Sequence, residues 1–188
     1  MHLSEILNAE LASFRERTGK ARLDILETGT IRGTTENYRV GDGWSTITFA
    51  EHVKANSGSL TSIDLDISNA ELVLKDKRLT KYVNLIKGSS VQEINALASG
   101  KTRATKRSVD VAFLDSGNDA SLTFSEYLTV REIMRTPGLI IVDDVDMNSH
   151  EVVKGHEIVP FLQAQGIEHR IIERMGDGFR TGVLVFEV

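Results

Sequence analysis

The stretch that decides the fold is LDILETGTIRGTTENYRVGDGWSTITFAEHV, residues 23–53. It opens with an apolar run, turns at Glu27-Thr28-Gly29, passes through polar residues and becomes amphipathic after Gly43. The apolar run is typical of a buried strand, and the spacing in residues 44–55 indicates a helix. A strand, a glycine turn and a helix in this order are a common way to hold a nucleotide-like ligand.

The rest of the chain continues this alternation. Strands are expected at residues 21–27, 60–66, 82–88, 109–115, 138–144, 168–174 and 180–188, and helices at 44–55, 68–81, 90–98, 121–135 and 151–165. Pro160 predicts a kink or an interruption in the last helix. The alternation predicts an α/β fold with a parallel sheet and helices on both faces. The last strand follows a short turn and is therefore expected to be antiparallel to its predecessor.

An additional helix is expected at residues 1–19. Its apolar residues recur at helical spacing, Ser4 is a candidate N-cap and Gly19 ends the segment. Because this helix lies outside the alternating pattern, it is a candidate surface for a homo-oligomer.

Composition narrows the possible classes of protein. The formal charge of −5 argues against a nucleic-acid partner, and the absence of cysteine excludes disulfides and thiolate zinc sites. No apolar stretch is long enough to span a bilayer, and the first residues lack the apolar run of a signal peptide. We therefore expect a cytoplasmic protein without a membrane partner. The basic run at residues 100–108 is interpreted as a solvated loop.

Acidic residues gather where the expected strands end. In an open parallel sheet, these ends lie at one edge, and ligands bind there. The acids are Glu27, Asp64, Asp66, Asp115, Asp143 and Asp144. Each could cap the next helix, but acids at so many strand ends also suggest a bound cation or a ligand rich in hydrogen-bond donors.

The glycine turn does not fit a phosphate ligand. A phosphate-binding loop needs a lysine after its last glycine, and Trp44 follows Gly43 here. A dinucleotide-binding turn needs a second glycine where Ile31 stands. Glu27, two residues before Gly29, would repel a pyrophosphate but suits a ligand that carries an ammonium group.

From Leu23 to Val188, these motifs and their order resemble the class I S-adenosylmethionine-dependent methyltransferases. The chain is most similar to small metal-dependent O-methyltransferases, namely the relatives of catechol O-methyltransferase and of sugar- and antibiotic-tailoring enzymes. The resemblance implies a Rossmann-like, doubly wound sheet of seven strands, mostly parallel with an antiparallel last strand. One methyltransferase-like domain, residues 1–188, is expected, with residues 33–42 inserted as a flap over the active site.

The resemblance also implies a cofactor site for S-adenosylmethionine. Glu27 would serve the cofactor's amino group, Asp64 its ribose hydroxyls, and Ser89 and Ser90 its adenine. The helix start that faces the methionine carboxylate is assigned to Gly43 and Ser45, although Gly33-Thr34-Thr35 competes for that place. The full set of cofactor-binding residues is Glu27, Thr28, Gly29, Gly43, Ser45, Asp64, Ser89, Ser90 and Asp115.

Metal binding is a further implication of the resemblance. Asp115, Asp143 and Asp144 match the positions that hold magnesium in metal-dependent relatives, and three oxygen ligands suit Mg²⁺. The bland alternative is that two of these acids cap helices and Asp144 is solvated. Asn118 stands where catechol-type enzymes carry a lysine base, so that Asp115 and His150 are the candidate catalytic residues.

The expected function is methyl transfer to an oxygen of a small or sugar-like acceptor, with possible metal assistance. Two alternatives remain: a cofactor-binding domain without transfer activity that acts through a partner, and an NAD-dependent oxidoreductase. Trp44 either stacks on the ligand or packs in the core. The apolar stripe Phe124, Tyr127, Leu128 and Met134 is expected to be core.

Overall fold

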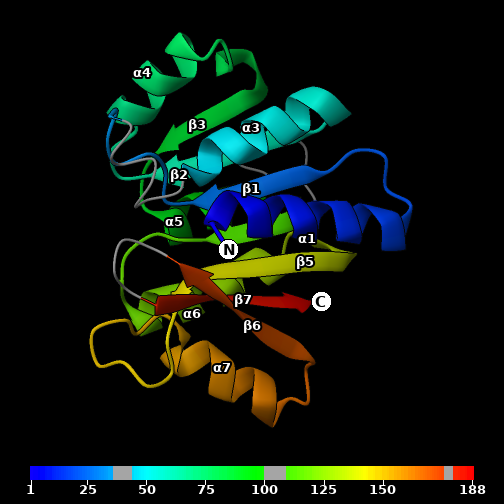
Figure 1. The fold of residues 1–188 in the computed structure, drawn as a ribbon, viewed down its shortest axis with the longest axis vertical. Helices are drawn as coiled ribbons and strands as arrows, with labels where there is room; N and C mark the ends of the chain where they lie inside the picture. Colours follow the sequence, from blue (N-terminus) through cyan, green and yellow to red (C-terminus); the bar gives the residue numbers. More distant parts are fainter. Residues whose placement is uncertain (36–43, 100–108, 176–179) are drawn as a thin grey trace.

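A computed structural model describes residues 1–35, 44–99, 109–175 and 180–188, and shows a seven-stranded sheet between two layers of helices (Figure 1). The strands are β1 (Asp24–Thr28), β2 (Ser59–Asp64), β3 (Val83–Lys87), β4 (Val109–Leu114), β5 (Met134–Val145), β6 (His169–Met175) and β7 (Arg180–Glu187). The helices are α1 (Leu3–Thr18), α3 (Ser45–Asn56), α4 (Ser68–Asp76), the 3₁₀ turn η1 (Thr80–Tyr82), α5 (Ser90–Ala98), α6 (Ala120–Arg131) and α7 (Gly155–Ala164).

The strand order is β3-β2-β1-β4-β5-β7-β6. Strands β1 to β5 pair in parallel, whereas β7 is antiparallel to both β5 and β6. This confirms the predicted Rossmann-like sheet with its antiparallel last strand. The chain moves outward from β1 to β3 and then returns to place β4 on the other side of β1. The switch point, where ligands bind in such sheets, is therefore the gap between the ends of β1 and β4.

Strand alternation divides the core into two clusters. Ile25, Val111 and Leu139 face one cluster, which also contains the buried residues of α1, α3 and α4. Leu26 and Ala112 face the other, which contains those of α5, α6 and α7. This period-two alternation on a sheet buried on both faces explains the continuous apolar runs in the sequence.

Helix α1 belongs to the core rather than outside it. Its apolar side chains Leu3, Ile6, Leu7, Leu11 and Phe14 are all at most 2% exposed. Figure 1 shows α1 beside α3 on the near face of the sheet. The apolar face of this helix is thus packed within the chain itself, and a homo-oligomer stays a prediction. The predicted cap was also wrong: Ser4 lies inside the helix, and the backbone N–H of His2 donates to Glu5 Oε2 at 2.9 Å.

The boundary between α6 and β5 and the extent of the apolar stripe differ from prediction. Helix α6 ends at Arg131, and Met134 already belongs to β5, which continues through Pro137. Leu128 is 43% exposed, so only part of the predicted apolar stripe is core. Of the kink or interruption predicted at Pro160, the interruption does not occur, because α7 runs through this residue. The predicted flap from residue 36 onward, Gly43, the loop 100–108 and the hairpin turn 176–179 lie outside the described residues.

Candidate functional site

Gly29 directly follows β1 at the switch point and lies against the backbone at the end of β4. Its φ of 82° lies in the left-handed region, and its N–H donates to Ile63 O at 2.9 Å. A Cβ on Gly29 would lie 2.2 Å from Asp115 O, while Asp115 N–H donates to Thr28 O at 2.9 Å. Only glycine combines this backbone conformation with so close an approach. The predicted turn is therefore built against the end of β4.

Glu27 is buried at the end of β1 and accepts hydrogen bonds from three hydroxyl groups. Ser45 Oγ donates at 2.6 Å, Thr46 Oγ1 at 2.8 Å and Ser62 Oγ at 2.6 Å. Burial raises the pKa of Glu27 to about 7; the hydroxyl groups oppose this shift and the charge of Asp115 adds to it. Neutral donors leave the carboxylate charge uncompensated, so a cationic group nearby would be bound favourably.

The predicted helix start faces Glu27. Ser45 is the first residue of α3, and its hydroxyl is committed to that carboxylate. Trp44 precedes it with a φ of 43° and is 5% exposed within the apolar core, in keeping with the core alternative.

Asp64 ends β2 with both carboxylate oxygens oriented by the backbone. Oδ2 accepts from Thr30 N–H at 2.9 Å, and Oδ1 accepts from Asp66 N–H at 3.0 Å. Each oxygen has a further lone pair, so the pair can still accept from ligand hydroxyls. Asp66 instead accepts from Ser68 N–H and Oγ at the start of α4, as its expected capping role requires.

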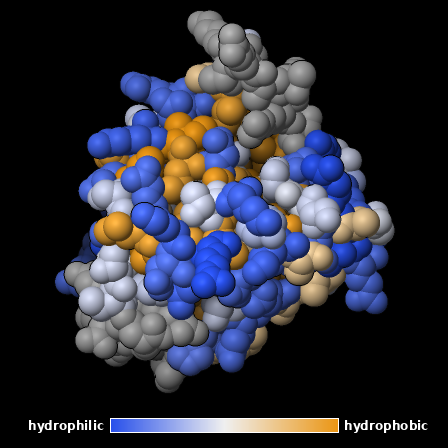
Figure 2. Space-filling model, turned by 90° about the horizontal axis from the view of Figure 1, so that it is seen from above, coloured by the Kyte–Doolittle hydropathy of each residue, from blue (hydrophilic) through white to orange (hydrophobic). Residues whose placement is uncertain are grey.

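Apolar surface lies next to Asp64. Leu65 is 72% exposed and Leu72 is 61% exposed, the two highest values among the described large apolar side chains. Figure 2 looks onto the end of the molecule that carries α4 and shows an apolar area within a mostly hydrophilic surface. Such an area can cover the face of a flat, apolar ring.

Behind the turn lies a second buried acid, Glu126, on α6. Thr28 Oγ1 donates to Glu126 Oε2 at 3.1 Å, and burial raises the pKa of Glu126. Ser90, the first residue of α5, is also buried, whereas Ser89 is its N-cap residue and makes no side-chain capping bond. Glu126 was not predicted as a site residue. Its spacing from Thr123, Tyr127 and Val130 places it on the buried face of α6 and could have indicated it.

The three predicted metal ligands do converge. Asp115, Asp143 and Asp144 offer oxygen atoms within 4.8 Å of one another. The backbone of Asp144 has a φ of 53°, which turns the chain directly after the buried Asp143.

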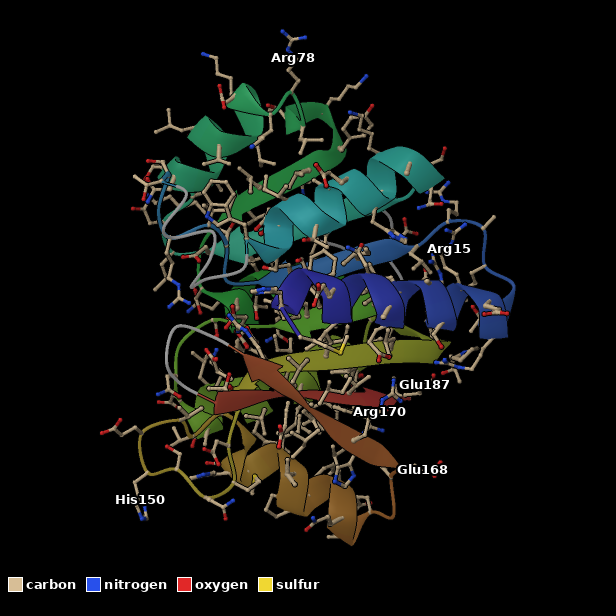
Figure 3. The ribbon with its side chains drawn as sticks, in the orientation of Figure 1. Arg15, Arg78, His150, Glu168, Arg170 and Glu187 are labelled. Carbon is tan, nitrogen blue, oxygen red and sulfur yellow. The ribbon has the colours of Figure 1, made fainter. Side chains whose placement is uncertain are left out.

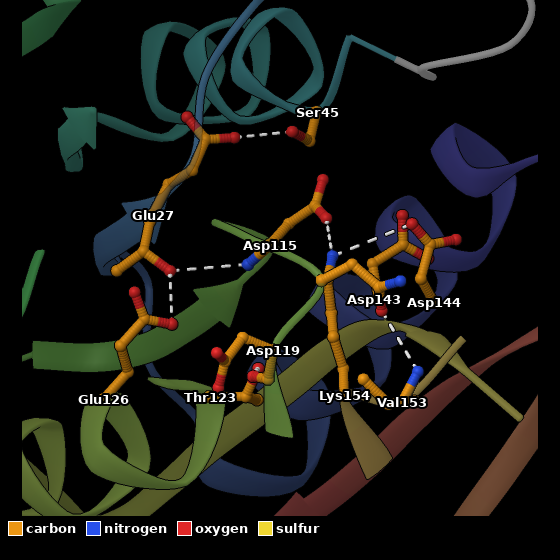
Figure 4. A network of polar contacts seen from close by, with 12 residues as sticks. Glu27, Ser45, Asp115, Asp119, Thr123, Glu126, Asp143, Asp144, Val153 and Lys154 are labelled. Atoms are coloured by element: carbon orange, nitrogen blue, oxygen red, sulfur yellow. Dashed lines mark hydrogen bonds and ion pairs between the residues drawn. The ribbon is translucent and has the colours of Figure 1, made fainter. Parts of the chain in front are cut away.

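Two cations that were not predicted from the sequence contact these acids: Lys154, which Figure 4 shows beside Asp115 and Asp144, and Arg174. Lys154 Nζ forms an ion pair with Asp115 Oδ1 and lies 3.7 Å from Asp144 Oδ2. Arg174 Nη1 forms an ion pair with Asp143 Oδ2 and lies 3.6 Å from Asp144 Oδ1. Burial lowers the pKa of Lys154, but Asp115 and Asp144 outweigh it and leave that pKa above its ordinary value. Burial raises the pKa of Asp143 to about 7, and the charge of Asp115 adds to the shift.

The other candidates have local roles. Asn118 Oδ1 accepts from Val153 N–H at 3.0 Å, and Asn118 Nδ2 donates to Glu151 O. Asp119 caps α6 by accepting from Leu122 N–H at 2.8 Å. His150 is exposed, and Figure 3 shows it pointing away from its loop, so it does not face the acid cluster.

The strand order, the glycine turn at the switch point and the row of strand-end acids together define the class I methyltransferase architecture. Residues 39–145, more than half of the chain, match the family described as a methyltransferase domain. The chain belongs to this family and is a class I S-adenosylmethionine-dependent methyltransferase.

Solved structures share the fold. An O-methyltransferase of Bacillus cereus in complex with SAH aligns with a TM-score of 0.67 and 16% identity, over 93% of this chain and 76% of that one. Human methyltransferase-like protein 13 in complex with SAH gives 0.68 and 17%, over 100% and 82%. The O-methyltransferase TomG of Streptomyces achromogenes, involved in tomaymycin synthesis and solved with SAM, gives 0.59 and 19%, over 89% and 73%.

A search of curated proteins found no significant match. In the part of the chain that the structure describes, no helix is long and apolar enough to cross a membrane.

Proposed function

We propose that this methyltransferase moves the methyl group of S-adenosylmethionine to an oxygen of a small acceptor molecule. The observation that carries the proposal is the junction at Gly29. On one side of this junction lie Glu27 and Asp64, two acids that accept hydrogen bonds from neutral donors. On the other side lies Asp115, the first residue of the acid cluster. One side suits a ligand with an ammonium group and vicinal hydroxyls, and the other lies where an acceptor would approach.

The cofactor would bind along β1 and β2. Glu27 would attract its amino group, because a buried carboxylate with only neutral donors gains from a nearby positive charge. Asp64 would accept from the two ribose hydroxyls while Thr30 and Asp66 hold it in place. The exposed Leu65, directly after Asp64, would cover one face of the adenine. Ser89 and Ser90 would lie nearest the adenine, as the resemblance implies.

Transfer would be an in-line displacement. The acceptor oxygen would form a bond to the methyl carbon as the carbon–sulfur bond breaks, so that the sulfonium becomes a neutral thioether. The proton of the acceptor hydroxyl would pass to the carboxylate of Asp115. Asp115 contacts both halves, since its backbone N–H donates to Thr28 O and its carboxylate pairs with Lys154, and before transfer it would accept the hydrogen bond of that hydroxyl. Positioning of the two reactants would supply much of the rate.

Magnesium assistance, which the resemblance implies, meets an obstacle. The acids converge as metal ligands would, and Asp143 Oδ1 is buried without a partner among the described residues. However, Lys154 and Arg174 already contact all three acids. Three carboxylates with two buried cations present a net charge of only −1, so the set as it stands does not fit a divalent ion. The proposed transfer therefore uses no metal ion.

Calorimetric titration tests the cofactor assignment. We expect S-adenosylhomocysteine to bind and NAD not to bind. Asp64→Asn, which leaves one acceptor oxygen where two are needed, is expected to weaken binding of S-adenosylhomocysteine by about tenfold. Asp66→Asn is the matched control, because it removes the same charge two residues away and is expected to leave affinity unchanged.

Binding of NAD alone would refute the proposal and favour an oxidoreductase. Binding of S-adenosylhomocysteine without methyl transfer to any hydroxyl compound in a broad panel would favour the alternative of a cofactor-binding domain that acts through a partner. That alternative was suggested by Asn118, which stands where catechol-type enzymes carry a lysine base. In this chain Lys154 contributes a lysine to the acid cluster. A cytoplasmic location stays a prediction, and so does the absence of a nucleic-acid partner, which rests on the net charge of −5.

A further inference from the structure

The acid cluster holds cations of its own, and each is buried. The side chain of Lys154 is 3% exposed and that of Arg174 is 7% exposed. Lys154 Nζ lies between two of the acids, Asp115 and Asp144, which come from the ends of two neighbouring strands. This is the position that a divalent ion would take to ligate both strand ends.

The chain holds Lys154 in place from both sides. Before it, Asn118 ties the backbone of Glu151 and Val153 to the loop that follows β4. After it, Gly155 begins α7 so close to β5 that a Cβ would lie 2.5 Å from Val145 Cγ1. Because the backbone is fixed in this way, Lys154 could leave the cluster only by a change of its side-chain rotamer. Asn118, which stands where relatives carry a lysine, thus supports the lysine that this chain uses.

One observation points in the other direction. Asp143 Oδ1 is buried without a partner among the described residues, and an unpaired acceptor beside two other acids is what a metal site lacking its ion would show. Against it stands the cost of displacement. A metal at this position would have to expel a buried ammonium group from two carboxylates and leave it without a partner.

We infer that Lys154 is the resident cation of the acid cluster, and that this methyltransferase works without a divalent metal. The ammonium group holds Asp115 and Asp144 together as a metal would, and it is a positioning group rather than one that touches the acceptor. Metal-free methyl transfer rests on the proposed function. The role of Lys154 as resident cation does not, because it concerns only ion binding by the described residues of the free protein.

Titration of Mn²⁺, followed by the loss of its free electron paramagnetic resonance signal, tests the inference. Wild-type protein is expected to bind no Mn²⁺ with a Kd below about 1 mM. Lys154→Met removes the ammonium group and keeps the length of the side chain, so the three carboxylates become available. We expect this variant to bind Mn²⁺ at least about tenfold more tightly. Adding Asp144→Asn to it should abolish the gain.

Lys75→Met is the matched control. Lys75 is exposed on α4, so its replacement changes the net charge equally without opening the cluster. Tight Mn²⁺ binding by the wild type that Asp144→Asn removes would overturn the inference. So would a folded Lys154→Met protein that gains no affinity. The wild-type titration decides the matter if Lys154→Met does not fold, and titration with S-adenosylhomocysteine tests the proposed function separately.

Discussion

The two halves of the carboxyl edge hold their acids in opposite ways. On the cofactor side, Glu27 accepts hydrogen bonds from hydroxyl groups and Asp64 accepts them from backbone amides, so these donors carry no charge. On the acceptor side, Lys154 and Arg174 neutralise most of the charge of three acids. Acids held by neutral donors can still gain from a cationic ligand, whereas most of the charge of acids paired with internal cations is already neutralised. Acidic residues at this edge therefore have two roles: some can bind a ligand, and others pair with cations of the chain.

The largest effect is expected where the halves meet. Gly29→Ala places a Cβ 2.2 Å from a backbone oxygen and forces a side chain into the left-handed region. We expect it to lower the free energy of unfolding by about 3 kcal/mol or more. Urea denaturation measures this loss, and cofactor binding should be lost with it.

Gly19 provides the comparison for Gly29. It has a similar φ of 67°, but a Cβ there would meet nothing within 4 Å. Gly19→Ala should therefore cost only the conformational term, about 1 kcal/mol. Equal losses for the two variants would show that the approach of β1 to β4 is not the constraint at Gly29.

Much of this arrangement follows from the sequence. Apolar runs that alternate with amphipathic stretches predicted the α/β fold and its parallel sheet, because periodicity along the chain shows which faces are buried. The short turn before the last strand predicted that this strand is antiparallel. Acids at strand ends predicted which residues gather at one edge. The boundary between α6 and β5 was wrong, since Met134 fits a helical apolar stripe as well as a strand.

What the sequence could not show is how the acids are paired. Arg174 reaches Asp143 from β6, and Lys154 reaches Asp115 from the start of α7. These partners are far apart along the chain and meet only once the sheet has formed. The sequence likewise did not show that Glu27 accepts hydrogen bonds from hydroxyl groups of α3 and β2. Spacing predicts a shared edge, but the balance of charge at that edge depends on tertiary contacts.

A second prediction sharpens the comparison through protons. The raised pKa of Glu27, about 7, means that the acid is partly protonated in the free protein near neutral pH. A cofactor ammonium group would favour the carboxylate, so binding of S-adenosylhomocysteine at pH 6.5 should release protons. Titrations in buffers of different ionisation enthalpy measure this release. Glu27→Gln should abolish it and weaken binding by about 1.5–3 kcal/mol.

The same group affects stability in a defined direction. Its pKa rises from 4.5 to about 7 on folding, so the folded state binds the proton more tightly. Its contribution is therefore full below pH 4.5 and is lost as the pH rises to about 7, a change of about 3 kcal/mol. Thermal unfolding across this range should show a smaller decline in Glu27→Gln. Identical pH profiles for the two proteins would mean that Glu27 is ionised throughout.

The smallest effect is expected from an acid that belongs to neither group. Asp119 lies in the loop after β4, close in sequence to Asp115, yet its carboxylate accepts from Leu122 N–H at the start of α6. Asp119→Ala should lower the free energy of unfolding by about 1 kcal/mol and leave the affinity for S-adenosylhomocysteine unchanged. Asp119→Asn keeps the capping oxygen without the charge and should restore most of that stability. Asp119→Asn could instead weaken ligand binding as Asp64→Asn is expected to do. The charge of Asp119 would then be part of the site, and Asp119 would have to be counted with the acids that bind the ligand.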